Sequence, residues 1–336
     1  MAEKTLIVLI LVHGIMGWGE NSQDSKQDQM KVYYYGVQPF LQKEYGAKVN
    51  LVMVAPTLPR ADSVKNRGTA LKEAIGKELK KWPVGTRVHI LAHSMGGLDS
   101  RWVVAEGGMA DAVASLTTIA TPHRGTTLGD LAYDELPILI PAGGFLDTLY
   151  KIRRSIWRAL PFTRSADQDH LAFFNQMLIG FDSTPEQLSA GVRALTLEGA
   201  DEFNRGLAEK ERSILARKDK PVKYLAYGGI PDGDQVPLLK PTRRFIELLG
   251  TREEKKWGDP KENKPGNDGA VSVWSAHFPW DPEGRYYAKT IPYDHFAQVN
   301  WRIPENRKPG EQEMSEGLKA VYREIMDNIL KVQGMR

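Results

Sequence analysis

Along the first half of the chain, continuous apolar runs alternate with segments in which apolar residues recur every three or four positions. Thr5 to Val12 form a continuous apolar run, which is typical of a strand buried on both faces. After Ser63, apolar residues recur every three or four positions with lysines opposite, which predicts an amphipathic helix. The same reading predicts strands at 49–55, 88–91, 114–120 and 222–227, and helices at 37–45, 183–206 (two short ones), 243–249 and 317–332. Because strands and helices alternate up to residue 120, we expect a mostly parallel, doubly wound α/β sheet.

One turn in this pattern carries a candidate nucleophile. Residues 87–100 read RVHILAHSMGGLDS, a short buried strand, then Ser94, then the start of a helix. Such a turn projects a serine hydroxyl from the carboxyl edge of a sheet, and needs small residues two positions before and after it. Ala92 and Gly96 are these residues, and Ala92 departs from the glycine of the G-x-S-x-G pattern. By itself the turn also fits an ordinary strand-to-helix connection.

The loop after the first strand is rich in glycine. His13 to Gly19 contain three glycines in six positions, so backbone N–H groups can point inward around a bound group. An ordinary glycine-rich loop is the alternative. Tyr33, Tyr34 and Tyr35 follow, and packing of a helix against the sheet is favoured over a role in lining a cleft.

The alternation breaks down between about 131 and 220. Residues 145–160 predict a helix with an apolar stripe backed by basic side chains, which suits a lid that covers a cleft and can lie on a lipid surface. A plain surface helix is the alternative. We therefore predict a single domain over 1–336 with a lid insertion at 131–220.

Composition excludes several classes of protein. The 336 residues are 41% hydrophobic, enough for one large α/β domain, and the net charge of +3 gives no reason to expect a nucleic-acid partner. The chain has no cysteine, so disulfides and thiolate chemistry are excluded. The apolar run at 6–12 is too short for a transmembrane segment or a signal peptide, so any export signal is absent or was removed.

Three motifs together resemble one known family. LVHGIMGWG, LAHSMGG and SLTTIATPHRGT occur in this order within residues 5–130, as in the bacterial lipases of the α/β-hydrolase fold, the Proteus, Pseudomonas and Burkholderia group. The resemblance implies an α/β-hydrolase fold with a helical lid, a serine hydrolase mechanism and secretion. It marks the TPHRG turn as structural.

Ester hydrolysis by this fold needs a nucleophile, an acid and a histidine, in that chain order. His295 is the preferred base, because DHF resembles the setting of the lipase histidine. His277 is the alternative that also follows a plausible acid. The remaining histidines, which sit in motif turns, in a strand or ahead of the acid, are His13, His89, His93, His123 and His170.

Asp268 is the candidate acid, because it lies in NDG and matches the Asn-Asp-Gly turn that follows a strand in the family. A plain turn former is the alternative. Asp232, Asp234 and Asp294 are its rivals, and Asp294 is disfavoured because adjacent residues in an extended loop point apart.

Backbone N–H groups of Met95 and Ile15 are the candidate oxyanion-hole donors. The reaction requires no cofactor. Many of these lipases bind a structural calcium, with a carboxylate two residues after the histidine, but Ala297 occupies that position here. Calcium is therefore doubtful, and we assign no metal ligands.

These observations predict a lipase that cleaves acylglycerol esters at a lipid–water interface with Ser94, His295 and Asp268. A soluble-ester carboxylesterase, or a thioesterase or acyltransferase, would use the same triad. A non-catalytic binding relative is the third possibility, against which the presence of all three residue types argues. The sequence leaves acyl chain length, stereochemistry and oligomeric state open.

Overall fold

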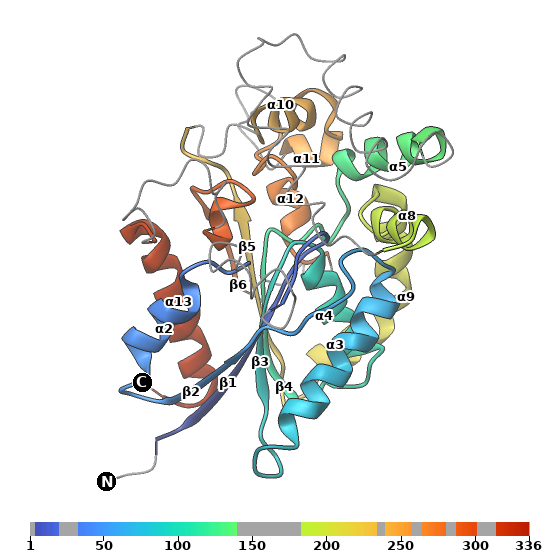
Figure 1. The fold of residues 1–336 in the computed structure, drawn as a ribbon. Helices are drawn as coiled ribbons and strands as arrows, with labels where there is room; N and C mark the ends of the chain where they lie inside the picture. Colours follow the sequence, from blue (N-terminus) through green and yellow to red (C-terminus); the bar gives the residue numbers. More distant parts are fainter. Residues whose placement is uncertain are drawn as a thin grey trace.

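The centre of the molecule is a six-stranded sheet in which every neighbouring pair is parallel (Figure 1). The computed structural model describes residues 4–19, 33–139, 183–233, 239–256, 264–279, 287–300 and 314–335. The strand order is β2-β1-β3-β4-β5-β6. The strands are β1 Leu6–Val12, β2 Asn50–Val54, β3 Val88–His93, β4 Val113–Ile119, β5 Lys223–Gly229 and β6 Tyr287–Ile291. The predicted parallel α/β sheet is confirmed.

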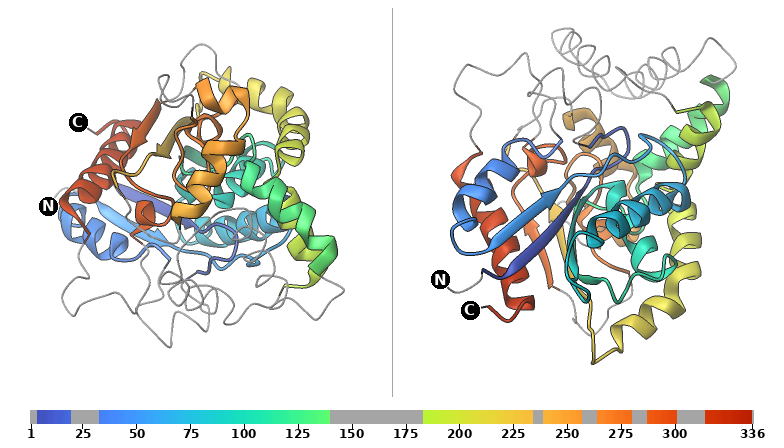
Figure 2. Two further views of the ribbon diagram at one scale, coloured as in Figure 1. Left: turned by 90° about the horizontal axis from the view of Figure 1, so that it is seen from above. Right: turned by 60° about the horizontal axis from the view of Figure 1, so that its bottom comes forward.

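Helices cover both faces of the sheet (Figures 1 and 2). α2 (Val37–Tyr45) and α13 (Glu316–Val332) lie on one face. The other face is covered by α3 (Val64–Leu79), α4 (Met95–Ala105) and α9 (Leu197–Leu215). Side chains of β1 alternate between the two hydrophobic cores that result. This double burial explains why the strand is apolar throughout.

The other described helices gather near the carboxyl ends of the strands, at the top of Figure 1. They are α5 Thr127–Leu139, α8 Pro185–Arg193, α10 Leu239–Leu249, α11 Arg252–Lys256 and α12 Val273–Ala276. A 3-10 turn, η3, spans Ala297–Val299. Thr184 begins α8 with a capping box to Gln187.

Several local predictions were wrong. The second of the two short helices expected within 183–206 is α9, which runs on to Leu215. The stretch from 237 to 265, expected as a surface excursion, buries Phe245, Ile246 and Glu254; its α10 contains the helix expected at 243–249, whereas α11 was not predicted. β6 was not predicted, because this edge strand is short and mixes polar with apolar residues. The helix expected at 145–160 lies outside the described residues.

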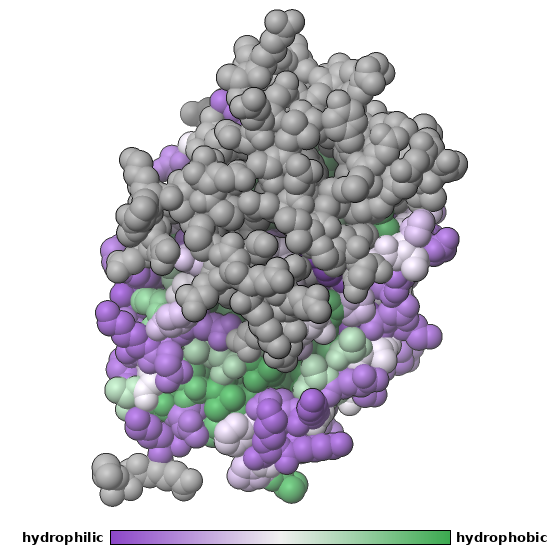
Figure 3. All heavy atoms as spheres, viewed as in Figure 1, coloured by the Kyte–Doolittle hydropathy of each residue, from purple (hydrophilic) through white to green (hydrophobic). Residues whose placement is uncertain are grey.

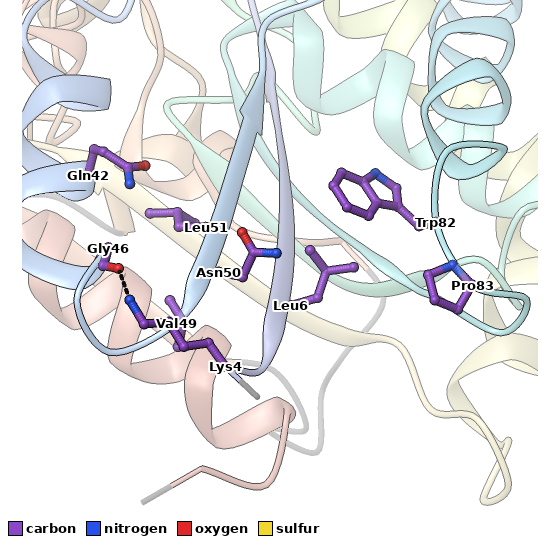
Figure 4. Close-up of a pocket in the computed structure, with 9 residues that line it drawn as sticks. All are labelled: Lys4, Leu6, Gln42, Gly46, Val49, Asn50, Leu51, Trp82 and Pro83. Atoms are coloured by element: carbon purple, nitrogen blue, oxygen red, sulfur yellow. Dashed lines mark hydrogen bonds between the residues drawn. The ribbon is translucent and has the colours of Figure 1, made fainter. Parts of the chain in front are cut away.

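A pocket of about 520 Å³ opens at the amino ends of the strands, on the opposite edge of the sheet from the loops that follow them (Figure 4). It is lined by Lys4, Leu6, Gln42, Gly46, Val49, Asn50, Leu51, Trp82 and Pro83. The Lys4 ammonium donates to the carbonyl of Gly46 at 2.9 Å. This pocket contains no residue expected to take part in catalysis.

The sheet ends at β2, where Val52, Met53 and Val54 are only partly buried. Figure 3 shows apolar surface gathered in the lower half of this view, with polar residues around it.

None of the helices in the described ranges combines the length and hydrophobicity that crossing a membrane requires.

Candidate active site

Ser94 lies in the turn between β3 and α4, at the carboxyl edge of the sheet. Its backbone adopts φ 54° and ψ −133°, in the region that L-residues rarely enter, and its side chain is buried. A methyl group on Gly96 would lie 2.7 Å from the carbonyl oxygen of His13, and one on Gly97 would clash with Thr121. The two glycines therefore let the start of α4 pass close to the loops that follow β1 and β4.

His295 and Asp268 meet Ser94 at this edge. Nε2 of His295 lies 3.1 Å from Oγ of Ser94, and Nδ1 lies 3.0 Å from Oδ2 of Asp268. The backbone N–H of His295 also donates to the carbonyl of Asp268 at 2.9 Å. The imidazole is therefore held between a hydroxyl and a carboxylate, as proton transfer from the serine would require.

Asp268 was expected in a turn that follows a strand, but residues 264–267 before it form no strand. Asn267, directly before it, forms an isolated antiparallel bridge to Ser272. Oδ1 of Asp268 accepts from the N–H groups of Ala270 and Val271, at 2.9 and 2.8 Å. Oδ2 accepts from Nε2 of Gln298 at 3.0 Å as well as from His295. Both oxygens of this buried carboxylate are thus satisfied and fixed in direction.

The loop after β1 lies against the serine. A Cβ on Gly14 would come within 2.8 Å of Cβ of Ser94, so the two backbones are in close approach. Met16 has a positive φ of 63°, and its N–H donates to the carbonyl of Arg60. Ile15 therefore directly follows a residue that lies against Ser94, and Met95 directly follows the serine.

Two buried side chains brace this loop. Nε2 of His13 accepts the N–H of Leu58, so Nδ1 carries the proton that it donates to the carbonyl of Gly14 at 2.8 Å. Burial, then the charge of Arg67, lowers the pKa of His13 to about 3, so the ring is neutral. Arg67 is paired with buried Asp99 and donates to the carbonyl of His13 at 2.9 Å.

The other histidines have structural contacts. His89 lies against Ser115 and Gln333, and His123 lies against Thr118 and Arg101. His277 follows α12, where its carbonyl accepts from Arg124. His170 lies outside the described residues.

The rival acids are also accounted for. Oδ1 of Asp294 accepts the N–H groups of Phe296 and Ala297, which closes the turn after His295. Asp232 is exposed, and Asp234 lies outside the described residues.

The described histidine loop does not fit a calcium site. Calcium needs six to eight oxygen ligands, whereas Ala297 offers no side-chain oxygen and the Nε2 of Gln298 donates to Asp268 and to the carbonyl of Tyr293. No group of three or more His, Asp or Glu side chains in the described ranges is arranged as metal ligands.

Sequence reasoning missed Gln298 and the polar role of Tyr33. His93, expected to hold a turn rather than act as the base, lies 2.8 Å through Nε2 from the carbonyl oxygen of His295. Tyr34 packs in the core as expected, with its hydroxyl bonded to the backbone of β1 and β3. The hydroxyl of Tyr33 instead contacts the N–H of Gly14 and the ring of His93. No spacing along the chain signals this contact, because the groups come from separate loops.

Comparisons with known proteins relate the chain to lipases. Residues 57–134 match the family described as the PGAP1-like alpha/beta domain. The triacylglycerol lipase of Pseudomonas fragi is 25% identical over 316 residues, which is 91% of this chain and 92% of that protein. The triacylglycerol lipase of Burkholderia plantarii is 37% identical over 128 residues, which cover 38% of this chain and only 33% of the relative.

Solved structures show the same fold. The Staphylococcus hyicus lipase superposes with a TM-score of 0.55 at 20% identity, over 98% of this chain and 96% of that one. Lipase 1 from Pelosinus fermentans gives a TM-score of 0.54 at 17% identity, over 95% and 98%. We conclude that this chain is a hydrolase enzyme of the α/β-hydrolase fold and that it is similar to bacterial lipases of that fold.

Proposed function

We propose that the chain is a serine carboxylic-ester hydrolase that cleaves acylglycerol esters through an acyl-enzyme. The observation that carries this proposal is the hydrogen-bonded series from Ser94 through His295 to Asp268, at the carboxyl edge of a parallel sheet. Relatives named triacylglycerol lipase support the choice of an acylglycerol as substrate.

In this mechanism Oγ of Ser94 attacks the ester carbonyl carbon while its proton passes to Nε2 of His295. The tetrahedral intermediate collapses, the C–O bond breaks, and His295 protonates the departing alkoxide, which leaves as an alcohol. Water then loses a proton to His295 and attacks the acyl carbon. Ser94 departs with that proton and the carboxylic acid is released. Asp268 holds Nδ1–H and stabilises the imidazolium formed in each half-reaction.

The N–H groups of Ile15 and Met95 would receive the negative charge on the carbonyl oxygen. Their place beside Ser94 supports this role, and loss of one such donor typically costs about 3 kcal/mol of transition-state stabilisation. A side-chain substitution does not remove either donor, because both belong to the main chain.

The segment 131–220 would carry a lid on the same domain. Its last helix, α9, buries Leu207 and Ile214 in the core against the sheet, so the lid would be the part ahead of α9. Its described flanks support this assignment, because Ala132 and Tyr133 of α5 pack with Leu188 and Val192 of α8, and Ile15 joins the same cluster. Movement of the lid would then shift contacts of the loop after β1, residues 13–19, which we call the oxyanion loop. Secretion, as in the lipases it resembles, is part of the same proposal.

The test measures hydrolysis across glycerol and p-nitrophenyl esters of rising acyl length, together with labelling by an organophosphorus ester. We expect turnover to rise once the lipid exceeds its solubility, and one equivalent of label on Ser94. Ser94→Ala should abolish both. Ser100→Ala is the matched control, because this buried serine only donates to the carbonyl of Gly96.

Three outcomes would change the assignment. Turnover of soluble short esters without long-chain emulsions would make the protein an esterase. Preference for a thioester, or for an alcohol acceptor in place of water, would make it a thioesterase or acyltransferase. Absence of both turnover and label would leave a non-catalytic binding protein.

A further inference from the structure

We propose that Tyr33 and His93 are positioning residues that couple the oxyanion loop to the loop carrying His295. This inference rests on the proposed function. It assigns to these two side chains a joint role in alignment. Neither would touch the reacting atoms. His93 would act through the main chain of His295, and Tyr33 through the main chain of Gly14, which adjoins Ile15.

The two side chains form a continuous series of hydrogen bonds across three loops. The N–H of Gly14 donates to the Tyr33 hydroxyl at 2.9 Å, and that hydroxyl lies 2.7 Å from Nδ1 of His93. Nε2 of His93 lies 2.8 Å from the carbonyl oxygen of His295. A carbonyl can only accept, so Nε2 carries the proton, Nδ1 accepts, and Tyr33 donates to it.

Burial keeps the tautomer of His93 fixed. The side chain is 1% exposed, and burial, followed by the charge of His295, holds its pKa well below the ordinary value. A neutral ring has one donor and one acceptor, which are the two groups that this series uses. It also adds no positive charge beside His295 when that imidazole takes up a proton during attack.

The series acts at two places that decide alignment. At one end, Tyr33 fixes the peptide of Gly14, immediately before Ile15, and a methyl group on Gly14 would lie 2.8 Å from the Tyr33 hydroxyl. At the other end, His93 holds the carbonyl of His295, whose N–H is held by Asp268. Ser94 follows His93 directly, so the series would fix the positions of the loop after β1, the turn at Ser94 and the loop carrying His295 relative to one another.

The first test removes only the Tyr33 hydroxyl. Tyr33→Phe should lower kcat for a soluble p-nitrophenyl ester about tenfold, the size expected from loss of one hydrogen bond that aligns the groups which bind the transition state, with KM little changed. Tyr34→Phe is the matched control: this neighbouring tyrosine is more deeply buried, but its hydroxyl bonds to the carbonyls of Val12 and Leu91, so kcat should be unchanged.

Two substitutions of His93 separate the ends of the series. His93→Asn puts an amide oxygen near the place of Nδ1 and keeps an acceptor for Tyr33. His93→Gln puts an amide nitrogen near the place of Nε2 and keeps a donor to the carbonyl of His295. Tyr33→Phe should therefore lower kcat about as much in the Asn background as in the wild type, and less in the Gln background, where the hydroxyl lacks its acceptor and keeps only the bond from Gly14.

A role confined to packing would not produce this difference. An equal Tyr33→Phe effect in the wild type, Asn and Gln backgrounds, or no effect in the wild type, would overturn the proposal. The melting temperature of each variant is measured alongside, and assays run well below it. The wild type is assayed before any Tyr33 variant. If it neither turns over esters nor accepts the label, the proposed function fails rather than the positioning role.

Discussion

At the scale of single residues, the candidate site depends on polar groups that are buried and fully partnered. Asp268 is the clearest case, because four donors converge on its two carboxylate oxygens. Two of these donors are backbone N–H groups of its own turn, which follow from the NDG sequence. Gln298 and His295 come from the loop after β6. No local pattern at Asp268 could have predicted them.

Asp268→Asn should lower kcat by about 10³- to 10⁴-fold, because an amide offers the Nδ1 side of His295 no charge and can select the wrong tautomer. The measurement is kcat for a soluble ester, with circular dichroism to verify folding. Asp294→Asn is the matched control, since an amide oxygen can still accept the N–H groups of Phe296 and Ala297. A loss as large in the control would remove the distinction between the two carboxylates.

At the scale of elements, glycines at the start of α4 set how closely the helix can approach neighbouring loops. The sequence predicted small residues around Ser94, and the structure shows their physical reason at Gly96, which faces the carbonyls of Val12 and His13. The identity of that facing backbone was not predictable. It depends on β1 pairing with β3, which brings together residues about eighty positions apart.

Gly96→Ala should destabilise the protein by about 1–3 kcal/mol, because the added methyl group meets rigid backbone rather than a flexible side chain. Gly76→Ala is the opposite control. A Cβ at Gly76 in α3 meets nothing within 4 Å, and alanine is the better helix former, so we expect a gain of about 0.5–1 kcal/mol. Urea unfolding midpoints measure both, and changes of the same sign would contradict this account.

At the scale of the whole molecule, five histidines in the described ranges are buried as neutral rings. Burial is the main cause of the lowered pKa of each. The pKa is about 3 for His13 and about 4 for His89 and His277, and it lies well below the ordinary range for His93 and His123. The unfolded chain protonates these rings near pH 6.5, so it binds more protons than the folded chain below that value.

The unfolding free energy should therefore be constant with respect to these groups well above pH 6.5 and fall as the pH decreases toward about 4. Each such histidine adds a slope of about 1.4 kcal/mol per pH unit. Urea titrations between pH 7.5 and 5 measure this slope. His89→Gln should reduce it by the contribution of one proton, and an unchanged slope would show that His89 does not titrate as described.

The hydrophobic pattern by itself determined the alternating elements through residue 120 and therefore the parallel sheet, because a doubly covered strand and an amphipathic helix each leave a local periodic signal. The motifs around Ser94 also pointed, by resemblance, to residues 268 and 295. Only the tertiary structure decided what holds them: the contacts of Gln298, the series from Gly14 through Tyr33 and His93 to His295, and the length of α9. These contacts join loops that meet only because the carboxyl ends of parallel strands share one edge, and hydrogen bonds across such distances leave no periodic trace in the sequence.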